Sequence, residues 1–250
     1  MKIIVLMKRV PDLVEDLEVD ATGKALDSEH LKMTLNEFDD YALEEALLLK
    51  EATGGEVTAV ALDGEDVDKM LYTALAKGAD RALKVTGAGE PATTLALART
   101  FHQAISGRPY DLILTGVQAA DDRDGQLGPM VAALAGLPCV EVVTKVGVGA
   151  GGDGMVTIHK EYSGGVAAEL EVDLPAVLGI QTAGQPPRYA PVSKVRQVQE
   201  STTLETLAAP VGGGEGIAVV VMTLPESGAG AQMLAGVDEL VAVLEAKGVL

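Results

Sequence analysis

The sequence predicts an α/β fold: an open, mostly parallel, doubly wound sheet, with antiparallel strands added and a C-terminal arm. Two observations favour the parallel sheet. Short apolar runs alternate with amphipathic helical stretches through the first 140 residues, and glycines end several of the helical stretches. Alternating strands and helices of this length require βαβ crossovers, and therefore parallel strands. A third observation is that the pattern becomes strand-like after residue 140.

The first elements follow from local pattern. A strand is expected at 2–7, where the residues are apolar, continuous and largely β-branched. A helix is expected over 36–52, because Asn36 suits the N-cap and Gly54-Gly55 ends the apolar stripe. The same two periods predict further strands at 57–62, 82–85 and 112–115, and further helices at 66–77, 92–105 and 126–136.

The edge of this sheet is the first place to look for a ligand. In an open parallel sheet, ligands bind beyond the carboxyl ends of the strands. The loops after Met7, Leu62 and Thr115 are therefore the candidate site on topology alone.

The second half of the chain changes character. Segments 140–146 and 155–162 are strand-like and flank a Gly-rich turn, and 169–180 alternates before running apolar. We expect antiparallel strands that close one side of the sheet. These considerations predict an α/β domain over residues 1–180 with a ligand site at the carboxyl ends of its strands.

Residues 181–250 are expected to form an extended arm that ends in a helix. Segment 181–216 is rich in Pro, Gln, Gly and Ser and shows no regular period, which predicts a long irregular stretch. Near the end, apolar residues recur with helical spacing from Val237 to Leu244, and Lys247-Gly248 suits a helix C-terminus.

Composition narrows the function. The net charge of −18 disfavours binding to nucleic acid or to anionic membrane surfaces, and the scarcity of aromatic residues disfavours base stacking. Cys139 is the only cysteine, so an intrachain disulfide and a Cys-rich metal site are excluded. No stretch approaches the length of a membrane span, and the N-terminal apolar run is too short for a signal peptide. A cytoplasmic protein is expected.

Familiar catalytic and nucleotide motifs are weak. Gly147–Gly152 matches GxGxxG by letter, but a strand pattern follows it where a dinucleotide fingerprint needs a helix, so a hairpin turn is the better interpretation. His30, His102 and His159 lack metal-ligand spacing, and no Ser lies in GxSxG. We expect no catalytic residue and no metal site.

The loop 116–127 is the most informative segment. It leaves a buried strand and enters a helix, and the N–H groups of a helix N-terminus bind phosphate well. Gly116 and Gly125 permit close backbone approach, and Gln118 and Asp121 offer polar contacts. A solvated acidic loop is an equally weighted interpretation. Segment 36–39, also at a helix start, is a second and weaker candidate.

Several segments resemble the beta subunit of electron transfer flavoproteins, and they occur in that family's order. They are Lys8–Asp12, Leu35–Ala46, Thr73–Asp80, Gly116–Ala119, Lys160–Gly165 followed by Glu169 and Leu174–Val177, Pro187–Ala190, and Val237–Leu240. Together they cover nearly the whole chain.

The resemblance implies a flavodoxin-like, adenine-nucleotide-binding domain in a heterodimer with a larger alpha subunit, which holds most of the FAD. Such a heterodimer is an electron carrier rather than an enzyme, and this subunit holds a structural AMP in many members. By position, the cofactor-binding residues would be Leu6, Asn36, Glu37, Phe38, Asp39, Leu62, Gly116, Val117, Gln118, Ala119, Ala120, Asp121, Asp122, Arg123, Asp124, Gly125, Gln126 and Leu127.

The resemblance also implies a docking element for flavin-dependent dehydrogenases in the arm. The partner-binding residues would be Arg188, Tyr189, Val192 and Val195, with Val192 as the apolar anchor. The segment Asn36–Asp40 resembles the methylotroph branch, which takes electrons from trimethylamine dehydrogenase and carries AMP. The chain departs from the family at Glu37, where Pro is frequent, and at Leu13, where some members have a flavin-contacting Tyr. The family's usual Lys-rich run after this element is reduced to Lys194 and Arg196.

Two alternatives stay open. Within the family, an electron-bifurcating beta subunit would hold a second FAD in place of AMP and would oxidise NADH. Outside it, a universal-stress-like or pyrophosphatase-like nucleotide protein shares the expected fold. Those proteins need a phosphate loop such as GxxGxxG or SGGxDS, which the sequence lacks.

Overall fold

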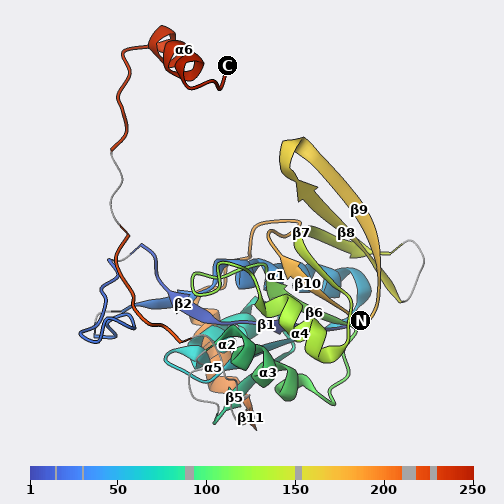
Figure 1. Ribbon diagram of the computed structural model, residues 1–250. Helices are drawn as coiled ribbons and strands as arrows, with labels where there is room; N and C mark the ends of the chain where they lie inside the picture. Colours follow the sequence, from blue (N-terminus) through green and yellow to red (C-terminus); the bar gives the residue numbers. More distant parts are fainter. Residues whose placement is uncertain (15, 30, 88–92, 150–153, 210–217, 226–229) are drawn as a thin grey trace. The chain divides into compact units, whose positions relative to one another are not determined.

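A computed structural model describes residues 1–14, 16–29, 31–87, 93–149, 154–209, 218–225 and 230–250. In these ranges nine strands form one sheet, in the order β11-β5-β4-β1-β6-β10-β7-β8-β9 (Figure 1). The strands are β1 (Lys2–Leu6), β4 (Glu56–Leu62), β5 (Arg81–Thr86), β6 (Leu112–Gly116), β7 (Cys139–Val148), β8 (Met155–Tyr162), β9 (Val166–Asp173), β10 (Ala176–Ile180) and β11 (Glu205–Ala208). The expected α/β fold with a mostly parallel sheet is confirmed.

Helices cover both faces of this sheet. The helices of the described residues are α1 (Glu37–Thr53), α2 (Val67–Lys77), α3 (Thr94–Ile105), α4 (Leu127–Ala135), α5 (Val192–Ser201) and α6 (Val237–Ala246), and of these α1 to α4 cover the sheet. Leu43 of α1 and Leu71 of α2 pack with Ile3 and Val5 of β1 on one face. Phe101 of α3 and Val131 of α4 pack with Ile4 and Leu6 on the other. Neighbouring residues of a strand point to opposite faces, so β1 supplies both cores and the sheet is doubly wound.

One expectation about the sheet is wrong. The apolar run that ends at Ile180 is not a further antiparallel strand: β10 lies inside the sheet and runs parallel to both β6 and β7. All five of its residues are buried. A strand covered on both faces reads as a continuous apolar run, and this pattern carries no information about direction.

The antiparallel part is confirmed for β7, β8 and β9, which pair in that order. The N–H of Gly149 donates to the carbonyl of Met155 (3.2 Å), so the Gly-rich segment joins two antiparallel strands, as the hairpin interpretation requires. Residues 150–153 of that segment lie outside the described residues.

The expectation of an irregular stretch over 181–216 is wrong for its middle part. Helix α5 forms there, and β11 then pairs in parallel with the edge strand β5. Neither element has a strong sequence signal, because α5 contains no buried residue and β11 has only four residues. A short antiparallel pair, β2 (Arg9–Pro11) with β3 (Met33–Leu35), was also not predicted.

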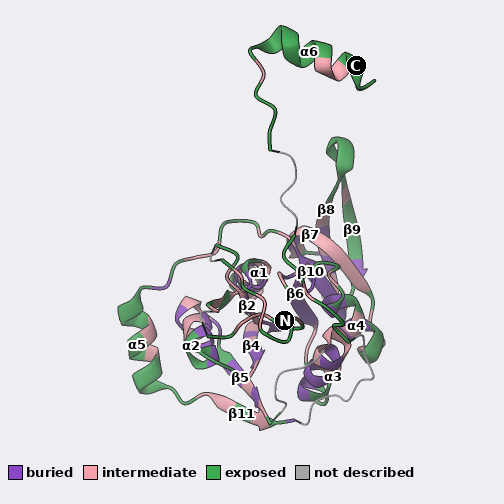
Figure 2. Ribbon diagram, turned by 60° about the vertical axis from the view of Figure 1, so that its left-hand side comes forward, coloured by how far each residue is buried: buried purple, intermediate pink, exposed green. Residues whose placement is uncertain are grey.

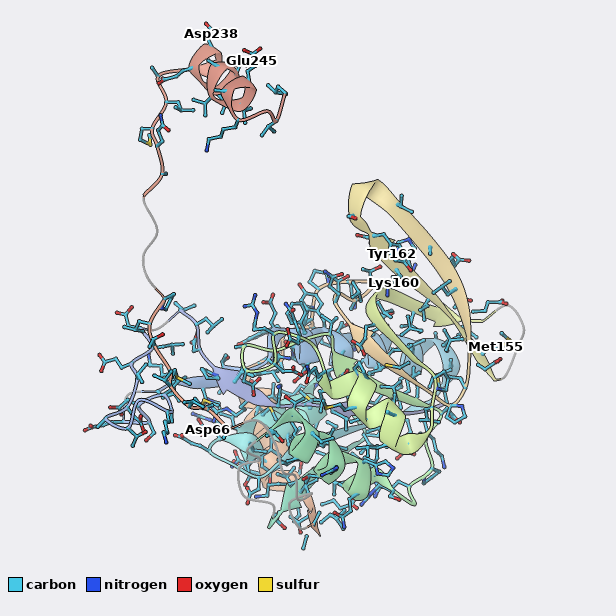
Figure 3. All side chains as sticks on the ribbon, in the orientation of Figure 1. Asp66, Met155, Lys160, Tyr162, Asp238 and Glu245 are labelled. Atoms are coloured by element: carbon cyan, nitrogen blue, oxygen red, sulfur yellow. The ribbon has the colours of Figure 1, made fainter. Side chains whose placement is uncertain are left out.

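The chain divides into two compact units. Unit 1 comprises Met1–Leu17 with Glu29–Ala218, and unit 2 comprises Glu18–Ser28 with Val219–Leu250. In unit 2 the predicted C-terminal helix is present as α6, and its apolar side chains Val237, Leu240 and Val241 are exposed (Figure 2). Asp238 and Glu245 also lie on α6 (Figure 3). No helix in the described part of the chain is long and apolar enough to span a membrane.

Candidate functional site

A cleft opens at the carboxyl edge of the parallel strands in unit 1. Its volume is about 660 Å³, and its walls come from the segments after β1, β4, β5 and β6, together with β3 and the residues before it. The lining residues are Lys8, Arg9, Leu31, Met33, Leu62, Asp63, Gly64, Glu65, Val67, Thr93, Thr94, Leu97, Phe101 and Asp121. This is the edge at which the topology predicted a ligand. Leu62 and Asp121 are the two predicted cofactor-binding residues that line it.

Segment 36–39 is hydrogen-bonded to the chain at the ends of β1 and β6. Asp39, which is only 2% exposed, accepts hydrogen bonds from the backbone N–H of Lys8 (2.9 Å) and of Gly116 (2.9 Å). Asn36 precedes α1 as predicted, but its side chain does not cap the helix. Its Nδ2 instead donates to the carbonyl of Gln118 (2.9 Å). These two side chains therefore fasten the start of α1 to the ends of β1 and β6.

The electrostatics of Asp39 follow from its burial. Desolvation raises the pKa of this carboxyl to about 6, although the Lys8 N–H and charge, Asn36 and the Gly116 N–H all act to lower it. Asn36 and Asp39 are buried, whereas Glu37 is exposed and Phe38 is half-buried, and none of the four lines the cleft.

Gly116 has a packing role that the sequence did not reveal. A Cβ built on Gly116 would lie 2.5 Å from Asp39 Oδ1, 2.7 Å from Phe38 Cβ and 2.9 Å from Asn36 Nδ2. The close approach that this glycine permits is thus between β6 and the start of α1.

The N-terminus of α4 already binds a carboxylate of the protein itself. Asp122 is buried, and its carboxylate accepts hydrogen bonds from the backbone N–H groups of Gln126 (3.0 Å) and Leu127 (3.1 Å). A carboxylate there is stabilised by the helix dipole and satisfies donors that lack an intrahelical partner. These two N–H groups, which the sequence suggested for phosphate, are therefore occupied by Asp122.

The remaining loop residues form a tight turn. Ala119 and Asp122 exchange two backbone hydrogen bonds (3.1 Å each), and Gly125, at φ +62°, donates to the Asp122 carbonyl. Ala119 is buried. Asp121, Arg123 and Asp124 are exposed, Gln126 is exposed at the helix start, and Val117, Gln118 and Ala120 are half-buried. Leu6 and Leu127 are buried in the core shared with α3 and α4.

The cleft brings in residues that the sequence did not single out. The Nζ of Lys8 forms an ion pair with Asp121 (2.6 Å). Arg9 donates to the carbonyls of Glu65 and Met33 and lies 3.8 Å from Asp66, the residue before α2 that Figure 3 labels. Thr93 caps α3, accepting from the Ala96 N–H (3.1 Å). Lys8 and Arg9 directly follow the first strand, so the rule about strand ends could have found them.

A second group of polar atoms is buried beneath α4. Thr115 Oγ1 and one carboxyl oxygen of Glu141, Oε2, have no hydrogen-bond partner among the described residues. Burial raises the pKa of Glu141 to about 7; the Cys139 thiol and Lys160 act to lower it, and Asp122 to raise it. Gly128 and Gly179 make room for this carboxyl group.

The predicted partner-binding residues lie together before and on α5. Tyr189 is 81% exposed and Val192 is 61% exposed, whereas Val195 is half-buried. Arg188 forms ion pairs with Glu44 (2.8 Å) and Glu51 (2.6 Å) of α1. No cluster of three or more potential metal ligands occurs in the ranges that the structure describes.

Comparison with known proteins gives one consistent family. Residues 25–210 match the family model described as the electron transfer flavoprotein domain. The chain is 35% identical over 215 residues to an electron transfer flavoprotein subunit beta from Methylophilus methylotrophus, covering 85% of this chain and 81% of the relative.

Relatives from distant organisms have the same description. A subunit beta from Bacillus subtilis is 34% identical over 192 residues, which cover 76% of this chain and 72% of the relative. A mitochondrial subunit beta from Arabidopsis thaliana is 32% identical over 246 residues, which cover 96% of each chain.

The packing around Gly116 predicts a stability defect. Gly116→Ala should lower the free energy of unfolding by about 1–3 kcal/mol, because the new methyl group collides with Asp39 and Phe38 in a filled interior. Gly147→Ala is the control, since its Cβ would meet nothing closer than 3.8 Å, and it should change stability by less than about 0.5 kcal/mol. Equal urea midpoints for the two variants would contradict this account.

The burial of Glu141 predicts a pH-dependent gain in the variant Glu141→Gln. The folded-state pKa of Glu141 is raised from 4.5 to about 7. Its contribution to stability is therefore fully present below pH 4.5 and is lost as the pH rises through 7. The stability of Glu141→Gln relative to the parent should increase by up to about 3 kcal/mol between pH 4.5 and 8. Urea unfolding of both proteins at each pH measures it, and a constant difference would refute it.

Proposed function

The chain belongs to the electron transfer flavoprotein family as one of its beta subunits, and we propose that it pairs with an alpha subunit to carry electrons from flavin-dependent dehydrogenases to an acceptor, with AMP held in its cleft. The electron-transfer role follows from the family match over residues 25–210. The observation that supports the nucleotide is the cleft at the carboxyl edge of β1 and β4.

The residues of the cleft suit an adenine nucleotide. A volume of about 660 Å³ lies within the range of small-molecule sites. Leu62, Val67, Leu97 and Phe101 supply apolar walls for a base. Thr94 stands at the first turn of α3, where helix N–H groups lack intrahelical partners and favour phosphate. Because Asp122 occupies the first N–H groups of α4, the N-terminus of α3 is the better phosphate-binding site.

In this proposal the two cofactors have different roles. FAD, held mostly by the alpha subunit, supplies the redox chemistry. AMP has no redox chemistry, so the beta subunit would use it to complete its packing at the sheet edge. Leu62 and Phe101 would hold the base, and Thr93 and Thr94 would orient the phosphate.

The alternative is a bifurcating beta subunit with a second FAD in the same cleft and with NADH oxidation. The same cleft would serve in both cases, since its volume of about 660 Å³ lies within the range of small-molecule sites. Extracting nucleotides from the purified heterodimer decides between the two. One flavin with one AMP per heterodimer supports the first proposal, and two flavins without AMP support the second.

A charge placed in the cleft should expel the nucleotide. Thr94→Glu puts a carboxylate at the first turn of α3, where it would repel a phosphate, and should reduce the AMP that co-purifies by at least about tenfold, which corresponds to about 1.4 kcal/mol of binding free energy. Thr73→Glu, on α2 and outside the cleft lining, adds the same charge and should keep stoichiometric AMP. Full AMP content in Thr94→Glu would contradict the proposal that the N-terminus of α3 binds the phosphate.

Docking through Val192 can be tested by reduction with trimethylamine dehydrogenase. Burying one valine contributes roughly 1.5–3 kcal/mol, and an aspartate in its place adds a charge that an apolar pocket cannot solvate. Val192→Asp should therefore lower dehydrogenase-dependent reduction of the flavin at least about tenfold. Flavin content and reduction by dithionite serve as controls and should not change. Normal reduction by the dehydrogenase would remove Val192 from the docking site.

A further inference from the structure

Two clusters of ion pairs bracket the segment that carries α5. In the first, Arg188 lies between Glu44 and Glu51 of α1, with N–O distances of 2.8 and 2.6 Å. In the second, Glu205 of β11 lies between Arg81 (2.5 Å) and Arg108 (2.6 Å). Each cluster joins one residue of the segment to two residues of the sheet and helix framework, and α5 lies between them in the chain.

The first cluster is the more deeply buried. Glu44 is 1% exposed, and it also accepts hydrogen bonds from the backbone N–H of Arg188 (2.9 Å) and from Nε2 of Gln185 (2.8 Å). Burial acts to raise the pKa of Glu44, but the hydrogen bonds from Arg188 and Gln185 hold it below its usual value. An arginine fork on a buried carboxylate fixes direction as well as distance.

Packing against its neighbours stabilises the position of α5 only weakly. The helix lies against α2, yet none of its residues is buried (Figure 2). Val195 and Val198 are half-buried, while Val192 faces outward. The direction of the helix therefore depends on how its flanking chain is attached at Arg188 and at Glu205.

We propose that Arg188 and Glu205 are positioning residues, which hold α5 in one orientation so that Val192 meets a redox partner without a preceding loss of freedom. A docking helix that is already ordered avoids the entropic cost of being ordered on binding. The inference rests on the docking role proposed for α5. Arg188 itself needs no contact with the partner.

The orientation of α5 can be measured without a partner. Spin labels at Ala52→Cys on α1 and Gln199→Cys on α5, in a Cys139→Ser background of the heterodimer, report the distance distribution between the helices. Arg188→Met leaves Glu44 unpaired, so the pair Glu44→Met with Arg188→Met, which removes both charges, is the safer variant. It should at least double the width of the distribution. An unchanged width would overturn the proposal.

Lys77→Met is the matched control for this experiment. It removes the ion pair between Lys77 of α2 and Asp40 of α1 (2.5 Å), which joins α1 to the helix that α5 lies against but does not involve the α5 segment. The distance distribution should keep the parent width in this variant. A broadening equal to that of the paired variant would show that any ion pair at these helices has the same effect, and would also overturn the proposal.

A kinetic readout separates positioning from a general structural role. With trimethylamine dehydrogenase, the paired variant should raise the concentration for half-maximal reduction at least fivefold and change the maximal rate less than twofold. On the Val192→Asp background it should have no further effect, because both changes remove the same contact. Additive effects would overturn the proposal. If Val192→Asp is silent while the label distances broaden, the docking role fails and the positioning of α5 stands.

Discussion

The carboxylate of Asp39 is the contact on which the ligand edge of this fold depends. It accepts one backbone N–H from the end of β1 and one from the end of β6, two neighbouring strands whose following chains must diverge to opposite faces of the sheet. An unpaired buried charge would be costly, whereas one that accepts two backbone N–H groups satisfies donors that the strand ends cannot pair with each other. Gly116 is a direct consequence, since no side chain fits between β6 and the start of α1.

The same edge shows how the protein distributes negative charge. The Asp122 carboxylate accepts the N–H groups at the N-terminus of α4, and near it lies Glu141, whose buried Oε2 has no hydrogen-bond partner among the described residues. Two acidic groups at one helix start make that end a poor host for a phosphate, although helix N-termini generally favour anions. The cleft lies instead between β1, β4 and the start of α3, and its lining carries both signs of charge: Lys8 and Arg9 are accompanied by Asp63, Glu65 and Asp121. The preference proposed for the α3 end therefore rests on its helix N–H groups and not on the net charge around the cleft.

The sequence predicted the structure correctly where burial determines both the local residue pattern and the element that forms. Apart from β2 and β3, the strands and helices up to Ala135 follow from burial on one or two faces, so their periodicity revealed them, and the glycines after α1 and α2 marked the ends of those helices correctly. The direction of β10 and the existence of β11 depend on contacts between residues far apart in the chain, which a period cannot encode. The same limit applies to Asp39 and Asp122. From the sequence, both carboxylates are expected to contact a ligand. The structure shows that they accept hydrogen bonds from backbone N–H groups of the protein itself.

Exposed apolar side chains divide the molecule into a framework and surfaces for association. The central strands β1, β6 and β10 are almost wholly buried, while Tyr162, Val166 and Leu170 are exposed on the β8–β9 hairpin, whose Lys160 lies 5.5 Å from the Tyr162 ring (Figure 3). Valines on α5 and α6 are exposed as well. The net charge of −18 favours solubility, so the chain tolerates exposed apolar side chains. Scattered exposed apolar residues are normal in soluble proteins. Rows of them on projecting elements are typical of interfaces. The heterodimer proposed above would need a lasting contact with the alpha subunit and brief contacts with dehydrogenases. Within unit 1, the β8–β9 hairpin and α5 carry separate exposed apolar side chains, which would allow both contacts at once.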